Sequence, residues 1–306
     1  MARVHEHRVL DRDYPHLLRD LSSPPDPLWV RGELLPAPTV AIVGTRRPSI
    51  AAIRYAHDLA FRLARSGVTV WSGGAKGIDA AAHAGALDAG GLSVAVVGTG
   101  LDHCYPDEHA ALYEEIVLTG GAVVSPFERS QNATLITFPQ RNGVLAALTQ
   151  ATVVVQAPLK SGARSTAAFA RRLRRPLFVV PTPPWDRRGA GNLVELELGA
   201  TPLTDEKRLF ECLGVVHRPR LRAGDPKPKR RDPAPDPSGS DAESILQRLP
   251  PSHRAVFEAA RNGARHVDDL CVRTGLPAAL VQGALLTLTL EAVLVEGPAG
   301  WVRRAK

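Results

Sequence analysis

Residues 68–87 read VTVWSGGAKGIDAAAHAGAL, and this stretch decides the fold. A short β-branched run is followed by a glycine-rich turn and then by an alanine-rich segment that favours a helix. This order is typical of one βα unit of a parallel sheet, in which the glycines allow a tight turn between strand and helix. The run is apolar rather than alternating, which predicts a strand buried on both faces.

The same unit recurs on both sides of this stretch. Similar β-branched runs occupy residues 40–43, 93–97, 122–125, 151–155 and 177–180, with helical stretches between them. Their spacing of roughly 25–30 residues is that of successive βαβ crossovers. In the first helical stretch, apolar residues recur every three or four positions up to Gly67, a residue type that commonly ends a helix. The sequence therefore predicts an α/β domain over residues 39–217, with a Rossmann-like, doubly wound parallel sheet.

The flanking segments predict three further parts of the chain. Residues 1–38 read as a short helix and an extended arm that packs on the main domain. Residues 218–240 contain six prolines, which is typical of a solvated linker. Residues 241–306 show helical patterns at 242–249, at 252–262 with 267–274, and at 278–290, followed by two short strands around a Gly-Pro turn. Three helices and a hairpin predict a small winged-helix domain.

Charge and cysteine usage limit the classes of function. The net charge is +7, but residues 218–240 hold seven Lys/Arg against three Asp, whereas residues 39–217 hold 18 basic and 15 acidic residues. A nucleic-acid function must therefore rest on particular residues of the main domain rather than on the overall charge. The three cysteines are far apart and form no CxxC motif, which predicts a reducing, cytoplasmic location. We expect no signal peptide, membrane span, metal site or cofactor.

Three loops carry the candidate chemistry. Ligands of open α/β sheets bind at the carboxyl ends of the strands, where backbone N–H groups and helix N-termini attract anions. The loops after the first three predicted strands supply Gly44, Thr45, Arg46 and Arg47; Ser72, Gly73, Gly74, Lys76 and Gly77; and Gly98, Thr99 and Gly100. Arg46 offers a bidentate fork and Lys76 a point charge. Together the loops predict a phosphate-binding pocket, although each glycine could also serve only its tight turn.

Other residue patterns narrow the type of pocket. The loops complete neither GxGxxG nor GxxxxGK[ST], which argues against a dinucleotide fingerprint and a P-loop. We interpret Asp79 as a helix cap and His83 as a core or surface residue rather than a catalytic one.

A further motif, at residues 138–142, suits unpaired bases. We predict that Phe138, Arg141 and Asn142 lie on a loop, where a ring, a guanidinium and an amide can stack on and hydrogen-bond to bases. Phe138 could instead fill the core, and Asn142 could cap a helix.

Taken together, these motifs resemble those of the DprA (DNA-processing, Smf) family. The resemblance runs from about residue 14 to 205 and includes Ala81-Ala82-His83, Tyr105-Pro106, Ser161-Gly162, Gly191-Asn192-Leu193 and Gly199-Ala200. It implies a homodimeric, non-enzymatic protein that binds and protects single-stranded DNA and loads the RecA recombinase during natural transformation, with Arg46 and Lys76 at DNA-contacting positions. The sequence departs from the family pattern at Gly143, where an arginine is usual, and in the residues that follow Gly162 and Pro181.

Two alternatives use the same pocket. Nucleotide phosphoribohydrolases that resemble the LOG family need a glycine-rich loop with a catalytic carboxylate, but residues 161–168 contain neither Asp nor Glu. This absence favours binding over catalysis. A sensor of small nucleotides stays open. The helix predicted at 278–290 offers one Gln and two Thr, so we expect the winged-helix domain to serve protein contacts rather than base reading.

Overall fold

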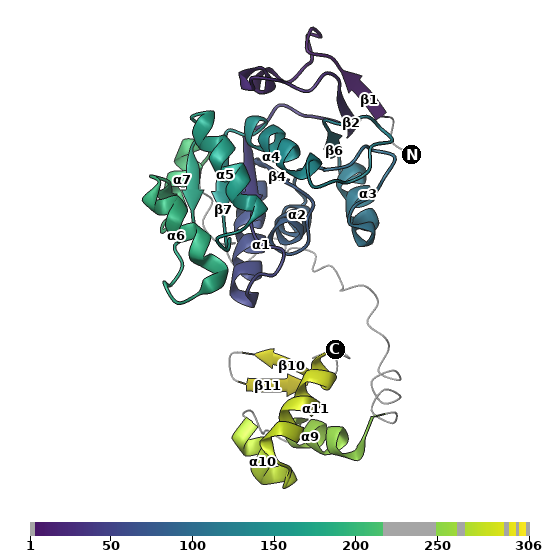
Figure 1. Ribbon diagram of the computed structural model, residues 1–306, viewed down its shortest axis with the longest axis vertical. Coiled ribbons are helices and arrows are strands. Elements are labelled where there is room, and N and C mark those ends of the chain that lie inside the picture. The colour runs from purple at the N-terminus through teal and green to yellow at the C-terminus, as the bar shows by residue number, and fades with distance from the viewer. Residues whose placement is uncertain (1–3, 217–248, 262–266, 291–293, 298–299, 304–306) are drawn as a thin grey trace. The chain divides into compact units, whose positions relative to one another are not determined.

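The computed structural model describes residues 4–216, 249–261, 267–290, 294–297 and 300–303 (Figure 1). The chain divides into two compact units, Met1–Arg230 and Arg231–Lys306. The predicted linker at 218–240 and nearly all of the predicted helix at 242–249 lie outside the described residues.

The first unit is built on one nine-stranded sheet in the order β1-β2-β6-β5-β4-β3-β7-β8-β9. Its parallel strands are β3 (Thr39–Val43), β4 (Thr69–Ser72), β5 (Ser93–Val96), β6 (Ala122–Ser125), β7 (Ala151–Val154), β8 (Leu177–Val179) and β9 (Thr201–Pro202). All six predicted strands are present within one residue at each end. The two-residue β9 was missed because so short a pairing leaves no periodic pattern in the sequence.

The N-terminal arm differs from its prediction. It contains β1 (Val4–His7), the short 3-10 helix η1 (His16–Asp20) and β2 (Leu28–Gly32). β2 pairs antiparallel with β6, and β1 pairs antiparallel with β2, so the arm extends the sheet instead of only packing on it. Leu28 and Val30 alternate into the core between half-buried neighbours, but the prolines before them hide this short pattern.

Helices cover both faces of the sheet. Alternate residues of β3 point in opposite directions: Val40 and Ile42 pack with α1 (Ile50–Arg65), α2 (Ile78–Asp88) and α7 (Lys207–Cys212). Ala41 and Val43 pack in a second core with α4 (Thr137–Ala147) and α5 (Gly162–Arg172). α3 (Ala110–Leu118) follows the 3-10 helix η2 (Asp107–His109) and covers β5 and β6, whereas α6 (Ala190–Glu197) follows η3 (Arg187–Gly189). The doubly wound, Rossmann-like architecture is confirmed.

The order of strands creates a crevice between β3 and β7. The chain runs from β3 through β4, β5 and β6, and then returns to place β7 on the other side of β3. The loops that leave β3 and β7 therefore diverge at the carboxyl edge of the sheet. Such a switch point is the usual ligand position in this architecture.

Within its described residues, the second unit has the helices predicted at 252–262, 267–274 and 278–290 and the predicted hairpin. α9 (Pro251–Arg261), α10 (Val267–Thr274) and α11 (Ala278–Leu290) precede the antiparallel pair β10 (Leu294–Gly297) and β11 (Gly300–Arg303). Its core contains Phe257, Leu270 and Leu285. Across both units, no described helix is long and apolar enough to cross a bilayer.

Candidate nucleic-acid interface

Two adjoining pockets open at the carboxyl edge of the sheet. The larger, about 480 Å³, lies at the switch point between residues 44–47 after β3 and residues 158–163 after β7. The smaller, about 100 Å³, lies between residues 73–76 after β4 and the segment of Tyr105 and Pro106. Arg46, Ala75, Phe138 and Arg141 line both pockets. These four residues therefore form the partition between the two spaces.

Arg46 and Phe138 of the partition form a cluster with Tyr105, which lines the smaller pocket. The Arg46 guanidinium lies 5.4 Å from the centre of the Phe138 ring, and the rings of Phe138 and Tyr105 are 5.5 Å apart and inclined by 53°. A Cβ on Gly98 would come within 2.8 Å of the Phe138 ring, which explains the glycine after β5. The cluster combines a cation with two aromatic faces beside glycine-rich backbone, the combination that grips phosphates and stacks bases.

Phe138, Arg141 and Asn142 lie in the first turns of α4, so their predicted loop was wrong. Pro139 sits at the third helical position, where no intrahelical N–H bond is required, and so it does not prevent the helix. Asn142 lines the larger pocket but is buried, and its Nδ2 donates to Gly162 O at 3.2 Å. Asn142 is therefore a bridge to α5 rather than a helix cap.

Arg141 is a buried cation directly behind both pockets. Its Nη1 donates to Val96 O at 3.0 Å, its guanidinium lies against Gly73, and its Nε has no hydrogen-bond partner within the described residues. Burial lowers the pKa of Arg141, although the Asp79 carboxylate opposes this shift. Desolvation raises the pKa of Asp79, against the effect of the Arg141 charge. The two groups favour each other's charged form, and each limits the other's shift.

Asp79 holds the glycine loop instead of capping α2. Its Oδ2 accepts from Gly73 N at 3.1 Å and from Ala75 N at 3.3 Å, both in the loop before the helix. α2 begins at Ile78, so Asp79 lies in the first helical turn. These two hydrogen bonds fix the backbone of the loop between β4 and α2, which also carries Lys76. The prediction that Asp79 caps the helix is therefore wrong, because its carboxylate stabilises the preceding loop.

The exposed cations differ in their surroundings. Arg46 and Arg47 are exposed at the mouth of the larger pocket. Lys76 is also exposed, but its Nζ lies 2.6 Å from Glu108 Oε2 of η2. A carboxylate therefore occupies the position where a phosphate oxygen would meet the ammonium group.

We expect Glu108→Gln to bind single-stranded DNA more tightly. The substitution removes a competitor for Lys76 and a charge that repels phosphate. Because both partners are exposed, the gain should be modest, about two- to fivefold at low ionic strength, and should shrink as salt screens the pair. Fluorescence anisotropy at two salt concentrations measures it. Glu197→Gln, an exposed change at the C-terminal end of α6, is the matched control. If Glu108→Gln and Glu197→Gln bound DNA with equal affinity, Glu108 would not compete with phosphate for Lys76.

Eleven of the fifteen predicted site residues line the pockets, and four do not. The exceptions are Ser72, Gly77, Thr99 and Gly100. Ser72 Oγ donates to Ile42 O at 2.6 Å, and Thr99 Oγ1 donates to His103 O at 3.2 Å, so both buried hydroxyls serve the backbone. The two glycines lie against backbone of neighbouring loops. For these four, the structure favours a role in the turns over ligand contact.

His83 has the predicted core role. It is fully buried, and its Nδ1 lies 2.8 Å from Ser93 Oγ. Ser93 Oγ donates its proton to Val70 O, so Nδ1 must be the donor to Ser93. Burial, with smaller effects of His109 and Arg141, lowers the pKa of His83 to about 3. A neutral imidazole is thus buried between α2 and the sheet, and His83 lines neither pocket.

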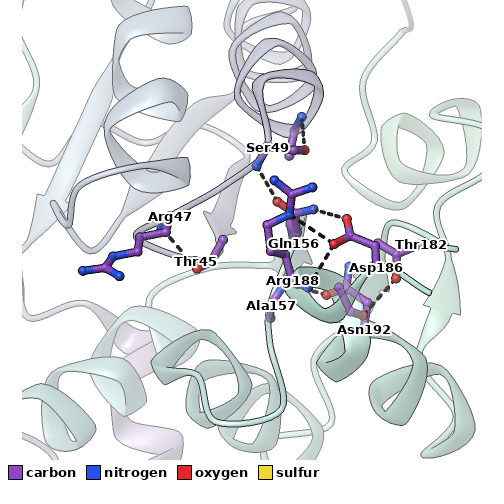
Figure 2. A network of polar contacts seen from close by, with 11 residues as sticks. Thr45, Arg47, Ser49, Gln156, Ala157, Thr182, Asp186, Arg188 and Asn192 are labelled. Carbon is purple, nitrogen blue, oxygen red and sulfur yellow. Dashed lines mark hydrogen bonds and ion pairs between the residues drawn. The ribbon is translucent and has the colours of Figure 1, made fainter. Parts of the chain in front are cut away.

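Three residues outside the predicted site, Lys160, Ser161 and Arg188, also line the larger pocket. Only the family resemblance had pointed to one of them, Ser161. The strand order that brings these loops beside β3 cannot be read from the residues of any one segment. Figure 2 shows one contact between the loops, in which Asn192 Oδ1 accepts from Ala157 N at 2.8 Å. Asn192 Nδ2 also donates to Val155 O and Val180 O. Asn192 thereby joins the loops after β7 and β8. No cluster of three or more potential metal ligands occurs within the described ranges.

Comparisons with known proteins agree on one family. Residues 7–214 match the family model described as DNA recombination-mediator protein A, and residues 229–300 match the DprA winged helix domain. Protein Smf of Synechocystis is 31% identical over 307 residues, covering 94% of this chain and 77% of that protein.

Two solved structures are similar in fold and sequence. DNA processing protein A of Streptococcus pneumoniae aligns with a TM-score of 0.64 and 31% identity, over 68% of this chain and 74% of that one. A Helicobacter pylori DNA processing protein A structure, which concerns its single-stranded DNA binding mode, aligns with a TM-score of 0.61 and 29% identity, over 69% of this chain and 96% of that one.

Proposed function

Because this chain belongs to the DNA recombination-mediator protein A (DprA) family, we propose that it binds single-stranded DNA across the two pockets at the carboxyl edge of its sheet. The observation that carries the proposal is the cluster of Arg46, Phe138 and Tyr105 between the pockets. The single-stranded DNA binding mode of the Helicobacter pylori protein, which shares this fold, supports the same ligand.

In this proposal, the cations and the aromatic rings make different kinds of contact with the strand. Arg46 and Lys76 contact neighbouring phosphates, the first as a fork and the second as a point charge. Phe138 and Tyr105 offer aromatic faces to unstacked bases. Contacts of these two kinds read neither base edges nor groove patterns, so binding has little sequence preference.

The proposed role is binding rather than bond cleavage. Of the residues that line either pocket, Asp79 alone carries a carboxylate, and it already accepts two backbone N–H bonds opposite Arg141. A phosphoribohydrolase would need a carboxylate free to act on the sugar. The residues after β7 offer Lys160 and Ser161 instead, which suit an anion.

We further infer the cellular role from the family. The protein protects incoming single strands during natural transformation and loads the RecA recombinase onto them. We propose that it does so as a cytoplasmic homodimer, which presents two sets of pockets to one strand. The winged-helix unit serves protein contacts: α11 buries Val281, Leu285 and Leu288 in its own core and carries few groups that read bases.

Titration with three labelled ligands tests the proposal. The ligands are a single-stranded oligonucleotide of mixed sequence, a duplex of equal length and a mononucleotide. We expect the protein to bind the single strand most tightly and the mononucleotide most weakly. The reason is that several phosphates and unstacked bases are contacted together. Tight binding of the mononucleotide alone would instead identify a nucleotide sensor, and a strong preference for one duplex sequence would identify a sequence-specific regulator.

A further inference from the structure

An exposed tryptophan lies on a loop that the proposed function does not use and that contributes Arg188 to the lining of the larger pocket. Residues 181–189, between β8 and α6, read PTPPWDRRG. Trp185 is 83% exposed, although tryptophan normally buries much of its surface. Arg187 and Arg188 are also exposed, and Arg188 lines the larger pocket. The loop therefore combines an aromatic face and two cations at the rim of the site.

Hydrogen bonds within the loop fix its shape. Thr182 Oγ1 donates to Gly189 O at 2.9 Å and closes its two ends. Asp186 Oδ1 accepts from Arg188 N at 3.0 Å and from Arg188 Nε at 3.1 Å, across the turn that follows Trp185. The backbone is thus held in place on both sides of the tryptophan.

The same loop is tied to the first phosphate loop. Gln156 Nε2 donates to Asp186 Oδ2 at 2.9 Å, while Gln156 Oε1 accepts from Ser49 N at 2.8 Å (Figure 2). Ser49 caps α1 directly after Arg46 and Arg47. One buried glutamine therefore sets the position of the tryptophan loop relative to the cations of the larger pocket.

The electrostatics of the loop favour an anionic partner. Desolvation is the largest single effect on the pKa of Asp186 and raises it, but the hydrogen bonds from Arg188 and Gln156 and the charge of Arg188 together lower that pKa overall. The only carboxylate of the loop is thus engaged in internal contacts. Arg187 beside it, and Lys160 in the lining of the larger pocket, contribute positive charge.

We propose that residues 181–189 form a second contact surface for single-stranded DNA, in which Trp185 stacks on a base and Arg187 and Arg188 contact the adjacent phosphates. The inference rests on the proposed function, because it extends the strand from the larger pocket onto this loop. Because the backbone on both sides of Trp185 is already held, the loop loses less freedom on binding, and stacking on the indole tolerates any base. Continuity with the pocket and the surplus of cations favour nucleic acid over a protein partner.

Oligonucleotides of two lengths test the inference with the full chain. Trp185→Ala should weaken binding of an oligonucleotide of about 20 nucleotides by about tenfold, the fold-change expected for one lost stacking contact. It should leave an oligonucleotide of about 4 nucleotides, which fills only the pockets, unchanged. Trp185→Phe keeps an aromatic face and should bind both within about twofold of the unsubstituted chain.

Tryptophan fluorescence gives a second readout. The longer oligonucleotide should quench the emission of the unsubstituted chain, and most of this quenching should vanish in Trp185→Phe although affinity is kept. Leu118→Ala is the control, because Leu118 is 84% exposed at the end of α3, which precedes β6 and so lies at the opposite edge of the sheet. It should change neither affinity nor quenching.

The outcomes separate this inference from the proposed function. If Trp185→Ala binds the longer oligonucleotide normally while Arg46→Ala loses affinity for both, the second surface is wrong and the pockets stand. If Arg46→Ala also binds both normally, the pocket assignment itself fails. A change in oligomeric state on size exclusion, without a change in DNA affinity, would assign Trp185 to contacts between copies and overturn the inference.

Discussion

The double substitution Arg46→Ala and Lys76→Ala is expected to weaken single-stranded DNA binding by about 100-fold or more at physiological salt. In the proposed complex each side chain makes a charge-assisted phosphate contact, which is worth about 1.5–3 kcal/mol. Two such contacts correspond to at least about two decades of affinity. The slope of log K against log salt should also flatten by about 1.4, since each phosphate contact to a single strand contributes about 0.7. Oligonucleotide titration at several salt concentrations measures both quantities.

The stability of the double variant should stay nearly unchanged, because both side chains are exposed. A matched control removes two cations from the opposite edge of the sheet: Arg65→Ala and Arg172→Ala lie at the C-terminal ends of α1 and α5. The control and the test variant have the same net charge. A loss of affinity that is equal in the two variants would therefore be due to the lower overall charge and not to the pockets. Full-strength binding by the test variant would show that the pockets do not hold the strand.

Gly73→Ala is expected to lower the free energy of unfolding by about 3 kcal/mol, from overpacking and a disturbed buried charge. A Cβ at this position would overlap the guanidinium of Arg141, which is buried and would have to turn into the pockets that it lines. Arg141 would then lose its hydrogen bond to Val96 O, and the buried Asp79 would lose its nearby positive charge. The displaced guanidinium would also occupy pocket space beside Phe138, so DNA affinity should fall with stability. Urea unfolding and oligonucleotide titration measure the two effects.

Gly162→Ala is the control for this substitution. The nearest neighbour of its added Cβ would be Asn142 Nδ2 at 3.8 Å, an ordinary contact, and the residue opens α5. Its free energy of unfolding should therefore be unchanged or slightly higher, because alanine favours helix over glycine. An equally stable Gly73→Ala variant would mean that Arg141 does not lie against the glycine loop.

Much of the fold is encoded locally. Strands buried on both faces require continuous apolar runs, so the six main strands could be located within a residue of their ends. Glycines at the strand ends and three-to-four spacing in the helices place the βα turns in the same way. The cations of the site follow, because Arg46 and Lys76 come directly after buried strands and must emerge at the carboxyl edge.

The local pattern also misled at two places within the site. Phe138 and Arg141 read as loop residues because a proline stands between them, yet the helix begins before it. Asp79 read as a helix cap, although its partners are the N–H groups of the preceding loop.

The sequence by itself determined the doubly wound sheet, the glycine-rich edge and the two exposed cations. Only the tertiary structure decided that β7 lies beside β3 and that the arm adds two antiparallel strands. The same structure joins the loops of Ser49, Gln156 and Asp186 around one pocket. The physical reason is that strand order and inter-loop hydrogen bonds depend on pairings between residues far apart in the chain, which leave no periodic trace in the sequence. Hydropathy shows which residues are buried, whereas only the assembled sheet shows which loops face each other.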